Sequence, residues 1–146
     1  MALVANKKAH LNYEILEKFE AGIELLGFEV KAIKANQGSL LAAHVLVRGG
    51  EAFLVGFDLP PYQSKNTPVD YDRVRARKLL LTKKELLHLQ NEGSKKGITI
   101  IALSIFAKGK KLKLDLALAR GKKKYDKRET LKKKDADREM RREIKY

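Results

Sequence analysis

Histidine is the residue of this chain best suited to acid–base or metal chemistry, because its ring titrates near neutral pH and its nitrogens bind metals. The chain has three histidines and no cysteine. We place His10 before a predicted helix, His44 at the start of a predicted strand and His88 on a later predicted helix. No two of them have the spacing of metal ligands or of a histidine nuclease. The sequence therefore predicts no catalytic residue, no metal site and no cofactor.

Loops that cradle phosphates are not indicated either. Arg48-Gly49-Gly50 lacks the lysine–serine ending of a phosphate-binding loop. The basic segment from Arg120 to Lys124 has no strand-to-helix setting around it, so we interpret it as a charged hinge. The absence of cysteine excludes disulfides and thiolate metal sites, and it is typical of a reducing cytoplasm.

Basic residues give the strongest signal in this sequence. Lys and Arg number 32 against 18 Asp and Glu, for a net charge of +14. Such a charge favours a polyanionic partner, because each neutralised phosphate releases condensed counterions. The basic residues cluster at Lys7-Lys8, at Arg73, Arg75, Arg77 and Lys78, and at Lys108, Lys110, Lys111 and Lys113. Each cluster alone is ordinary surface, but together they favour RNA, and Tyr13, Tyr62, Tyr71 and Tyr125 could stack on bases.

The elements that would position these residues are mainly strands. Apolar spacing predicts a helix over 11–20 and a strand over 23–33 with a bulge beside Gly27. Paired glycines predict a hairpin, and Thr82 with Glu85 predicts a capping box. The remaining predictions are a helical turn over 38–43, hairpin strands over 45–47 and 52–55, a loop over 63–77, and strands over 77–81, 98–106 and 112–119. We expect a mainly β fold, an OB-fold-like antiparallel barrel with short peripheral helices.

Charge and apolar content divide the chain into two parts. Residues 120–146 carry 13 basic and 6 acidic residues, whereas residues 1–119 carry 19 and 12. We therefore expect a barrel over 1–119 and a basic tail over 120–146 that is disordered when free and helical when bound to RNA. A tail that serves only solubility is the alternative. No apolar run is long enough to span a membrane, and no signal peptide precedes Asn6.

Three groups of stretches resemble one known family. The first comprises Asn6-Lys7-Lys8-Ala9-His10, Tyr13, Ile15, Glu20-Ala21-Gly22-Ile23 and Gly27-Phe28-Glu29-Val30-Lys31. The second comprises Arg77-Lys78-Leu79-Leu80-Leu81 and Lys84-Glu85-Leu86. The third comprises Leu118-Ala119-Arg120-Gly121-Lys122-Lys123 and Tyr125-Asp126-Lys127-Arg128. They occur in the order found in the SmpB family and cover nearly the whole chain, although Lys34-Ala35-Asn36 replaces the usual Arg-Ala-Gly. Asn tolerates a left-handed backbone, so we expect that turn to be kept.

The resemblance implies an RNA-binding site and a ribosome-contacting tail. The matching RNA-contact positions are Glu20, Leu80 and Lys113, although Glu20 could equally form a structural ion pair. With the basic residues near both ends, the predicted RNA-binding set is Lys7, Lys8, Tyr13, Glu20, Lys31, Leu80, Lys113, Arg120, Lys122 and Lys123. The predicted ribosome-contacting tail residues are Tyr125, Asp126, Lys127, Arg128 and Ile144.

The function implied by the resemblance is that of a non-enzymatic adaptor in trans-translation. Such a protein binds the transfer-RNA-like domain of transfer-messenger RNA and delivers it to stalled ribosomes. Its tail contacts ribosomal RNA at the decoding site and senses the empty messenger channel. We expect a cytoplasmic monomer with no membrane partner. A general RNA-binding barrel, such as a translation factor, and an enzyme, such as a nuclease, are the alternative hypotheses.

Overall fold

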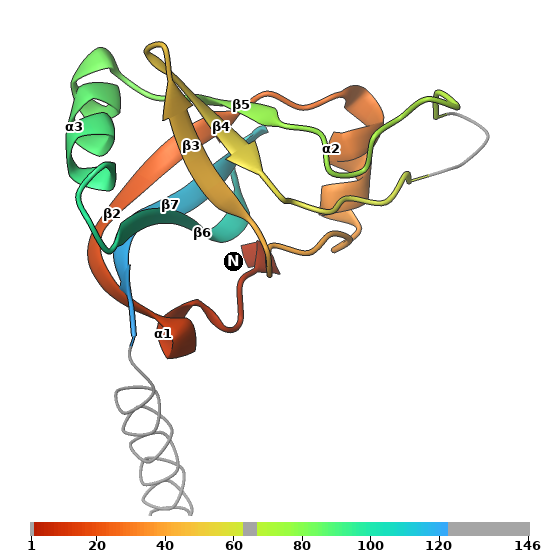
Figure 1. The fold of residues 1–146 in the computed structure, drawn as a ribbon. Coiled ribbons are helices and arrows are strands. Elements are labelled where there is room, and N and C mark those ends of the chain that lie inside the picture. The colour runs from red at the N-terminus through yellow and green to blue at the C-terminus, as the bar shows by residue number, and fades with distance from the viewer. Residues whose placement is uncertain (1, 63–66, 123–146) are drawn as a thin grey trace, which may run out of the picture.

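The computed structural model describes residues 2–62 and 67–122. This part of the chain forms seven antiparallel strands and three short helices (Figure 1). The strands are β1 (Ala2–Ala5), β2 (Tyr13–Ile23), β3 (His44–Arg48), β4 (Glu51–Val55), β5 (Arg77–Leu80), β6 (Ile98–Lys108) and β7 (Lys111–Gly121). The helices are α1 (Ala9–Asn12), α2 (Gly27–Lys34) and α3 (Lys83–Gly93).

Six of the described strands close into a barrel. The pairing runs from β6 through β3, β4, β5, β2 and β7 and returns to β6, while β1 adds to the free part of the β6 edge. Every pairing is antiparallel. The predicted mainly β fold with short peripheral helices is therefore confirmed. Closure also leaves few unpaired strand edges, which protects a small barrel from edge-to-edge association.

The β6–β7 hairpin and β2 form the longest wall of the barrel. Leu112, Leu114, Leu116 and Leu118 alternate along β7 and are buried in the main core, within the strand predicted over 112–119. The outward-facing side chains of β7 differ in their burial. Ala117 and Ala119 are buried in a second small cluster with Ala9 and Ile101, because α1 covers the outside of the barrel there.

The helix predicted over 11–20 is wrong, because β2 begins at Tyr13. A register shift between Ile15 and Glu17 turns successive apolar side chains to opposite faces. Ile15 packs on the outer cluster, and Phe19 packs on the main core. Because of this bulge, Ile15 and Phe19 lie on different faces of the strand although they are four positions apart. That spacing is the same as the spacing of apolar residues on one face of a helix.

The strand predicted over 23–33, with its bulge at Gly27, is also wrong. Helix α2 begins after Leu26, where the Glu29 side chain accepts a hydrogen bond from the Leu26 backbone N–H at 2.8 Å. The helix buries Glu29, Ala32 and Ile33, which share one helical face. Because one of these buried residues is a carboxylate, the spacing of the apolar residues alone did not show the helical period.

Several local predictions are confirmed. The β3–β4 hairpin turns at Gly49 and Gly50, whose φ angles are 58° and 76°. Thr82 and Glu85 form the reciprocal capping box of α3. The turn after α2 is kept, since Asn36 adopts a φ of 61°. The described residues 67–76 contain no helix or strand, as the predicted loop requires.

No helix among the described residues is long and apolar enough to cross a membrane. The same residues contain no group of three or more His, Asp or Glu side chains that could hold a metal ion. The predictions on residues 123–146, including the helical bound state of the tail, lie outside the described part of the chain.

Candidate nucleic-acid interface

Gly22 lies where three strands meet, at the point where β2 changes its neighbour. It pairs with Lys113 of β7 and with Leu80 of β5. An added Cβ at Gly22 would lie 3.2 Å from the Leu80 Cβ, so the lack of a side chain lets Leu80 lie close across β2. Leu80 and Lys113 are therefore neighbours, although 33 positions separate them in the sequence.

A groove of about 320 Å³ opens beside this junction. Its floor is apolar and includes Ile23, Leu25, Val30 and Leu80, the last with 52% of its surface exposed. Lys110, Lys111 and Lys113 lie along its rim, in the β6–β7 hairpin. We call this surface the hairpin groove. Apolar surface beside several cations suits a ligand that carries a flat apolar group and a negative charge.

Some cations of the described region are paired with carboxylates, and the rim lysines are not among them. Arg73, Lys78, Lys95, Lys108 and Arg120 each lie within 4.0 Å of an acidic side chain. Among the described residues, Lys110, Lys111 and Lys113 have no such acidic partner. Their charges are therefore available to an anionic ligand.

Glu20 lies two positions before Gly22 on the same face of β2. Its Oε1 accepts a hydrogen bond from Lys108 Nζ at 3.1 Å, and its cross-strand neighbour is Asp115. The ion pair links β2 to the end of β6, where Lys108 is the cross-strand neighbour of Lys111. Glu20 therefore forms an ion pair within the protein, which was the alternative expectation for this residue.

A second set of predicted residues gathers where β7 leaves the barrel. Lys122 donates from Nζ to the His10 carbonyl oxygen at 2.7 Å, and its backbone N–H donates to the Asn12 carbonyl oxygen at 2.9 Å. Arg120 Nη1 lies 3.9 Å from Glu14 Oε2. Lys7 and Lys8 are exposed at the start of α1. We call this surface the tail root.

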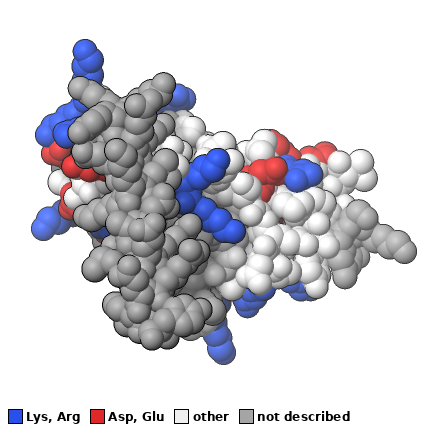
Figure 2. Space-filling view, turned by 90° about the horizontal axis from the view of Figure 1, so that it is seen from below, with Lys and Arg blue, Asp and Glu red and all other residues white. Residues whose placement is uncertain are grey.

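The predicted RNA-binding residues therefore fall on two surfaces. Lys113 and Arg120 are seven positions apart on β7, which corresponds to roughly 23 Å along a strand. The view from below shows several separate patches of basic side chains (Figure 2). Tyr13 is half-buried against the outer cluster around Ala9, and Lys31 is exposed on α2. Lys123 and the predicted tail residues lie outside the described part of the chain.

The arginine cluster predicted to contact RNA has a structural role instead. Arg77 is fully buried, and its five N–H groups are all used. They donate to Glu29 Oε2 at 2.9 Å, to the Tyr71 hydroxyl at 3.0 Å and to the carbonyl oxygens of Phe57, Arg73 and Arg75 at 2.8, 3.1 and 3.1 Å. Arg75 also pairs with Glu29, and Arg73 pairs with Asp58. The full burial of Arg77 shows that its predicted contact with RNA is wrong.

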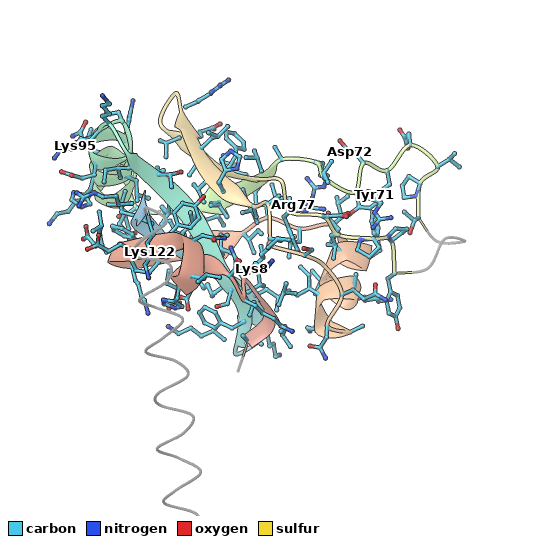
Figure 3. The ribbon with its side chains drawn as sticks, turned by 60° about the horizontal axis from the view of Figure 1, so that its bottom comes forward. Lys8, Tyr71, Asp72, Arg77, Lys95 and Lys122 are labelled. Carbon is cyan, nitrogen blue, oxygen red and sulfur yellow. The ribbon has the colours of Figure 1, made fainter. Side chains whose placement is uncertain are left out.

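Tyr71 completes this buried network. Its hydroxyl lies 2.9 Å from Glu29 Oε2 and 3.1 Å from the Leu59 carbonyl oxygen, and its ring meets Phe28 edge-on at 4.8 Å (Figure 3). Burial raises the pKa of Tyr71, and its hydrogen bond to Glu29 raises it further. Tyr71 is therefore a packing residue that ties the 67–76 segment to α2, and its ring is engaged with Phe28.

Glu29 carries the only fully buried carboxylate in the described region. Burial raises its pKa, but hydrogen bonds from Arg75, from the Leu26 N–H and from Arg77, together with the charge of Arg77, outweigh burial. The pKa therefore lies below the usual 4.5. The carboxylate stays charged at neutral pH and joins α2 to β5.

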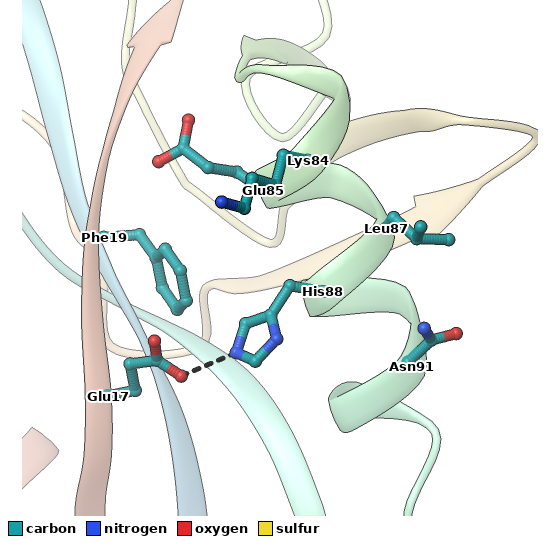
Figure 4. A pocket seen from close by; sticks show the side chains of 7 residues that line it. All are labelled: Glu17, Phe19, Lys84, Glu85, Leu87, His88 and Asn91. Atoms are coloured by element: carbon teal, nitrogen blue, oxygen red, sulfur yellow. Dashed lines mark hydrogen bonds and ion pairs between the residues drawn. The ribbon is translucent and has the colours of Figure 1, made fainter.

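A second open groove, of about 440 Å³, lies between β2 and α3 (Figure 4). His88 lies 2.7 Å from Glu17 and 5.9 Å from the Phe19 ring, so these three side chains bridge the two elements. Lys84 and Glu85 bring opposite charges to the same groove. With its carboxylates, this groove is a poorer match to a phosphate backbone than the hairpin groove.

Sequence reasoning did not single out Gly22, Lys110 or Lys111 as site residues. The lysines were visible as part of a basic cluster, but nothing in their spacing indicated an apolar floor beside them. That floor comes from α2, from β5 and from the segment between β2 and α2. Only the strand pairings at Gly22 bring these elements together.

A closed antiparallel barrel with unpaired lysines beside an apolar groove defines the class of nucleic-acid-binding barrels. A family model described as SmpB protein matches residues 3–146. The SsrA-binding protein of Malacoplasma penetrans is 44% identical over 142 residues, which cover 97% of each chain. That of Nitrosomonas europaea is 46% identical over 142 residues, covering 97% of this chain and 94% of the other.

A solved structure described as "tmRNA-SmpB: a journey to the center of the bacterial ribosome" is similar at a TM-score of 0.68. It is 38% identical in sequence and covers 83% of this chain and 85% of the other. This chain belongs to the SmpB family, as its resemblance predicted.

Proposed function

We propose that this protein is an RNA-binding adaptor of trans-translation. It binds the transfer-RNA-like domain of transfer-messenger RNA and brings that RNA to stalled ribosomes. Membership of the SmpB family supports the role, and the SsrA-binding names of its relatives agree with it. The observation that carries the proposal is the junction at Gly22, which joins Leu80 and the unpaired Lys113 in one groove.

The hairpin groove would meet the folded RNA. Leu80 offers an exposed apolar contact, and Lys113 offers a cation for a phosphate oxygen. In this proposal Glu20 acts as a positioning residue, because it holds the end of β6 through Lys108. No step requires bond breaking by the protein, so its role is non-catalytic.

The tail root would direct the remainder of the chain toward the ribosome. We assign Lys7, Lys8, Arg120, Lys122 and Lys123 to phosphate contacts near this point. We assign Tyr125, Asp126, Lys127, Arg128 and Ile144 to contacts with the ribosome, including the RNA of the decoding site. Residues 1–119 act as the RNA-binding barrel and residues 120–146 as the tail, in the cytoplasm, where ribosomes translate.

The test compares binding of the purified protein to three labelled RNAs at two salt concentrations. They are the transfer-RNA-like domain of transfer-messenger RNA, an ordinary transfer RNA and an unstructured strand. We expect tight binding to the first, with a preference that survives the higher salt. Equal and salt-sensitive binding to all three would instead support the general RNA-binding barrel.

A matched pair of variants connects this preference to the groove. Lys113→Ala should weaken binding to the transfer-RNA-like domain by about tenfold, whereas Lys18→Ala, an exposed lysine on the same strand as Gly22, should change it less than twofold. Equal losses in the two variants would contradict the assignment of the groove.

A further inference from the structure

The barrel closes between β3 and β6 at a single pair of residues. In the described structure these two strands pair where His44 opposes Ile101. The same antiparallel register would bring Val47 opposite Ile98, but the pairing does not extend that far. The other edge of β3 pairs with β4, and the other edge of β6 pairs with β7. Toward Val47 and Ile98, each strand therefore presents one edge without a neighbouring strand among the described residues.

A groove of about 350 Å³ follows these free edges. It lies between residues 44–47 of β3, residues 98–100 of β6 and the second half of α3, and we call it the edge groove. At Gly93 of α3, an added Cβ would lie 3.1 Å from Ile100 Cδ1, so the glycine lets the helix lie close to β6. Leu89 of the same helix is buried in the core, but the groove between the helix and the two edges stays open.

The β3–β4 hairpin determines which backbone groups of β3 face the edge groove. Its two-residue turn at Gly49 and Gly50 is closed by Arg48 and Glu51. In such a turn the closing pair exchanges hydrogen bonds, and residues along the strand then alternate between the two edges. The N–H and C=O groups of Val47 therefore point away from β4, toward the groove. Edge groups of this kind are a template for an added strand.

Most side chains on the strand side of the edge groove are apolar. Val45 and Ile100 are buried, Val47 and Ile98 are half-buried, and Leu46 exposes 37% of its surface. An extended polypeptide places alternate side chains on opposite faces, so every second residue of an added strand would meet this apolar surface. The groove therefore suits an occupant in which apolar and polar residues alternate.

Two cations lie at one end of the edge groove. Arg48 ends β3, and Lys96 lies two positions before Ile98, so the β3–β6 register places both at the same end. Both are exposed, and no acidic side chain of the described residues lies within 4.0 Å of either. Glu51, the cross-strand neighbour of Arg48, is paired with Lys78 instead. These charges favour an occupant that carries carboxylates.

We propose that the edge groove binds an extended segment of an acidic partner protein, which adds to β3 as a strand. The backbone of the segment pairs with Val47, its apolar side chains pack in the groove, and its carboxylates lie near Arg48 and Lys96. A nucleic acid does not meet these requirements, because its backbone has no N–H groups to pair with a strand edge. The edge groove lies at the start of β6 and the hairpin groove at its end, so both can be occupied at once.

The first experiment titrates the full-length protein into three labelled peptides of about six residues, the usual length of a strand. The glutamate peptide alternates glutamate with valine. The lysine peptide has lysine in place of each glutamate, and the N-methylated peptide is the glutamate peptide with alternate backbone N–H groups blocked. We expect saturable binding of the glutamate peptide and binding at least about tenfold weaker for the other two. The N-methylated peptide keeps its charge, so it controls for attraction to the basic tail.

The second experiment blocks the edge groove with a matched pair of variants. Gln90 and Asn91 are neighbours on α3 and are both exposed, but they line different grooves (Figure 4). Gln90→Trp should fill the edge groove and weaken binding of the glutamate peptide by about tenfold. Asn91→Trp is the control, because it faces the groove between β2 and α3, and it should change this binding less than twofold. Thermal unfolding of both variants checks that each is folded.

A charge reversal tests the same surface without filling it. Arg48→Glu/Lys96→Glu changes two exposed residues outside α3, so the helix and the groove stay as they are. This variant should bind the lysine peptide more tightly than the glutamate peptide, which reverses the preference of the wild type. An unchanged preference for the glutamate peptide would contradict the assignment of the two cations.

Three outcomes would overturn the inference. The first is a glutamate peptide that does not bind saturably. The second is equal binding of the N-methylated peptide, because charge alone would then explain the affinity. The third is loss of affinity for the transfer-RNA-like domain in Gln90→Trp, because the edge groove would then belong to the RNA interface. The expected result is loss of peptide binding with RNA binding unchanged.

Discussion

At the residue scale, Glu29 and Arg77 form a fully buried ion pair in the described part of the chain. Arg77 Nη2 lies 2.7 Å from Glu29 Oε2, and both side chains are fully buried. The Arg77 guanidinium also stacks over the Phe57 ring, 5.0 Å from its centre. Removing one partner of such a pair is costly, since the other is left buried without compensation.

We therefore expect Glu29→Gln to lower the free energy of unfolding by about 3–5 kcal/mol, measured by urea denaturation. The amide oxygen can still accept from the Leu26 N–H, so the start of α2 should be preserved. The control is Asp58→Asn, which removes the half-exposed partner of Arg73 and should cost less than about 1 kcal/mol. Equal effects of the two changes would contradict the structural role of the network.

The same carboxylate predicts how stability depends on pH. The folded-state pKa of Glu29 lies below its usual 4.5, so its contribution is fully present above that value. It is lost as pH falls below 4.5 through the lower folded-state pKa, because the unfolded chain then binds a proton that the folded protein does not. Urea denaturation at pH 7 and in steps below 4.5 should show a steeper loss in the wild type than in Glu29→Gln.

At the element scale, local backbone geometry decides how the strands connect. The turn after β4 depends on Gly56, whose φ is 74°. A Cβ at this position would lie 2.5 Å from the Ala42 carbonyl oxygen, which belongs to the chain entering β3. The turn therefore needs glycine both for its left-handed backbone and for the close approach of a neighbouring segment.

We expect Gly56→Ala to destabilise the protein by about 3 kcal/mol or more in urea denaturation. Gly97→Ala is the matched control, since Gly97 has a φ of 81° but open space around its Cα. That change should cost only the left-handed strain, about 1–2 kcal/mol. If the two variants lost equal stability, the contact with Ala42 would have no measurable effect.

The helix α3 shows how an element can be specified locally. Its capping box joins Thr82 and Glu85 through hydrogen bonds of 3.1 and 3.2 Å, and the same residues indicated its start in the sequence. Helix α2 begins with a hydrogen bond of the same type, but its N-cap is Leu26, which provides no polar side chain. That helix depends on the burial of Glu29 beside two arginines, which is a tertiary effect.

At the scale of the whole molecule, the barrel separates two basic surfaces. The hairpin groove and the tail root lie near opposite ends of β7, roughly 23 Å apart. A ligand at the groove therefore leaves the start of the tail free for a second contact. This separation fits an adaptor that binds one RNA with its barrel and meets the ribosome with its tail.

Truncation after Gly121 should separate these two roles. The shortened protein keeps the hairpin groove, so we expect its affinity for the transfer-RNA-like domain to fall less than about tenfold at moderate salt. We expect it to abolish tagging of stalled products in a reconstituted translation reaction. Full-length protein in the same reaction is the control, and tagging by the truncated form would show that the tail assignment is wrong.

The amino-acid sequence by itself determined the features that depend on neighbouring residues. The β3–β4 hairpin follows from Gly49 and Gly50, the α3 cap from Thr82 and Glu85, and the inward face of β7 from four alternating leucines. The charge of +14 indicated a polyanionic partner. Family resemblance, carried by ordered motifs, indicated the family to which the chain belongs.

Only the tertiary structure decided the features that depend on distant contacts. Arg75 and Arg77 had the spacing of an RNA-binding cluster, but Glu29, more than forty positions away, accepts their hydrogen bonds inside the protein. The bulge in β2 imitated a helix because it turned Ile15 and Phe19 to different faces. The hairpin groove exists because barrel closure pairs Gly22 with two strands at once, and no local pattern of residues encodes that long-range pairing.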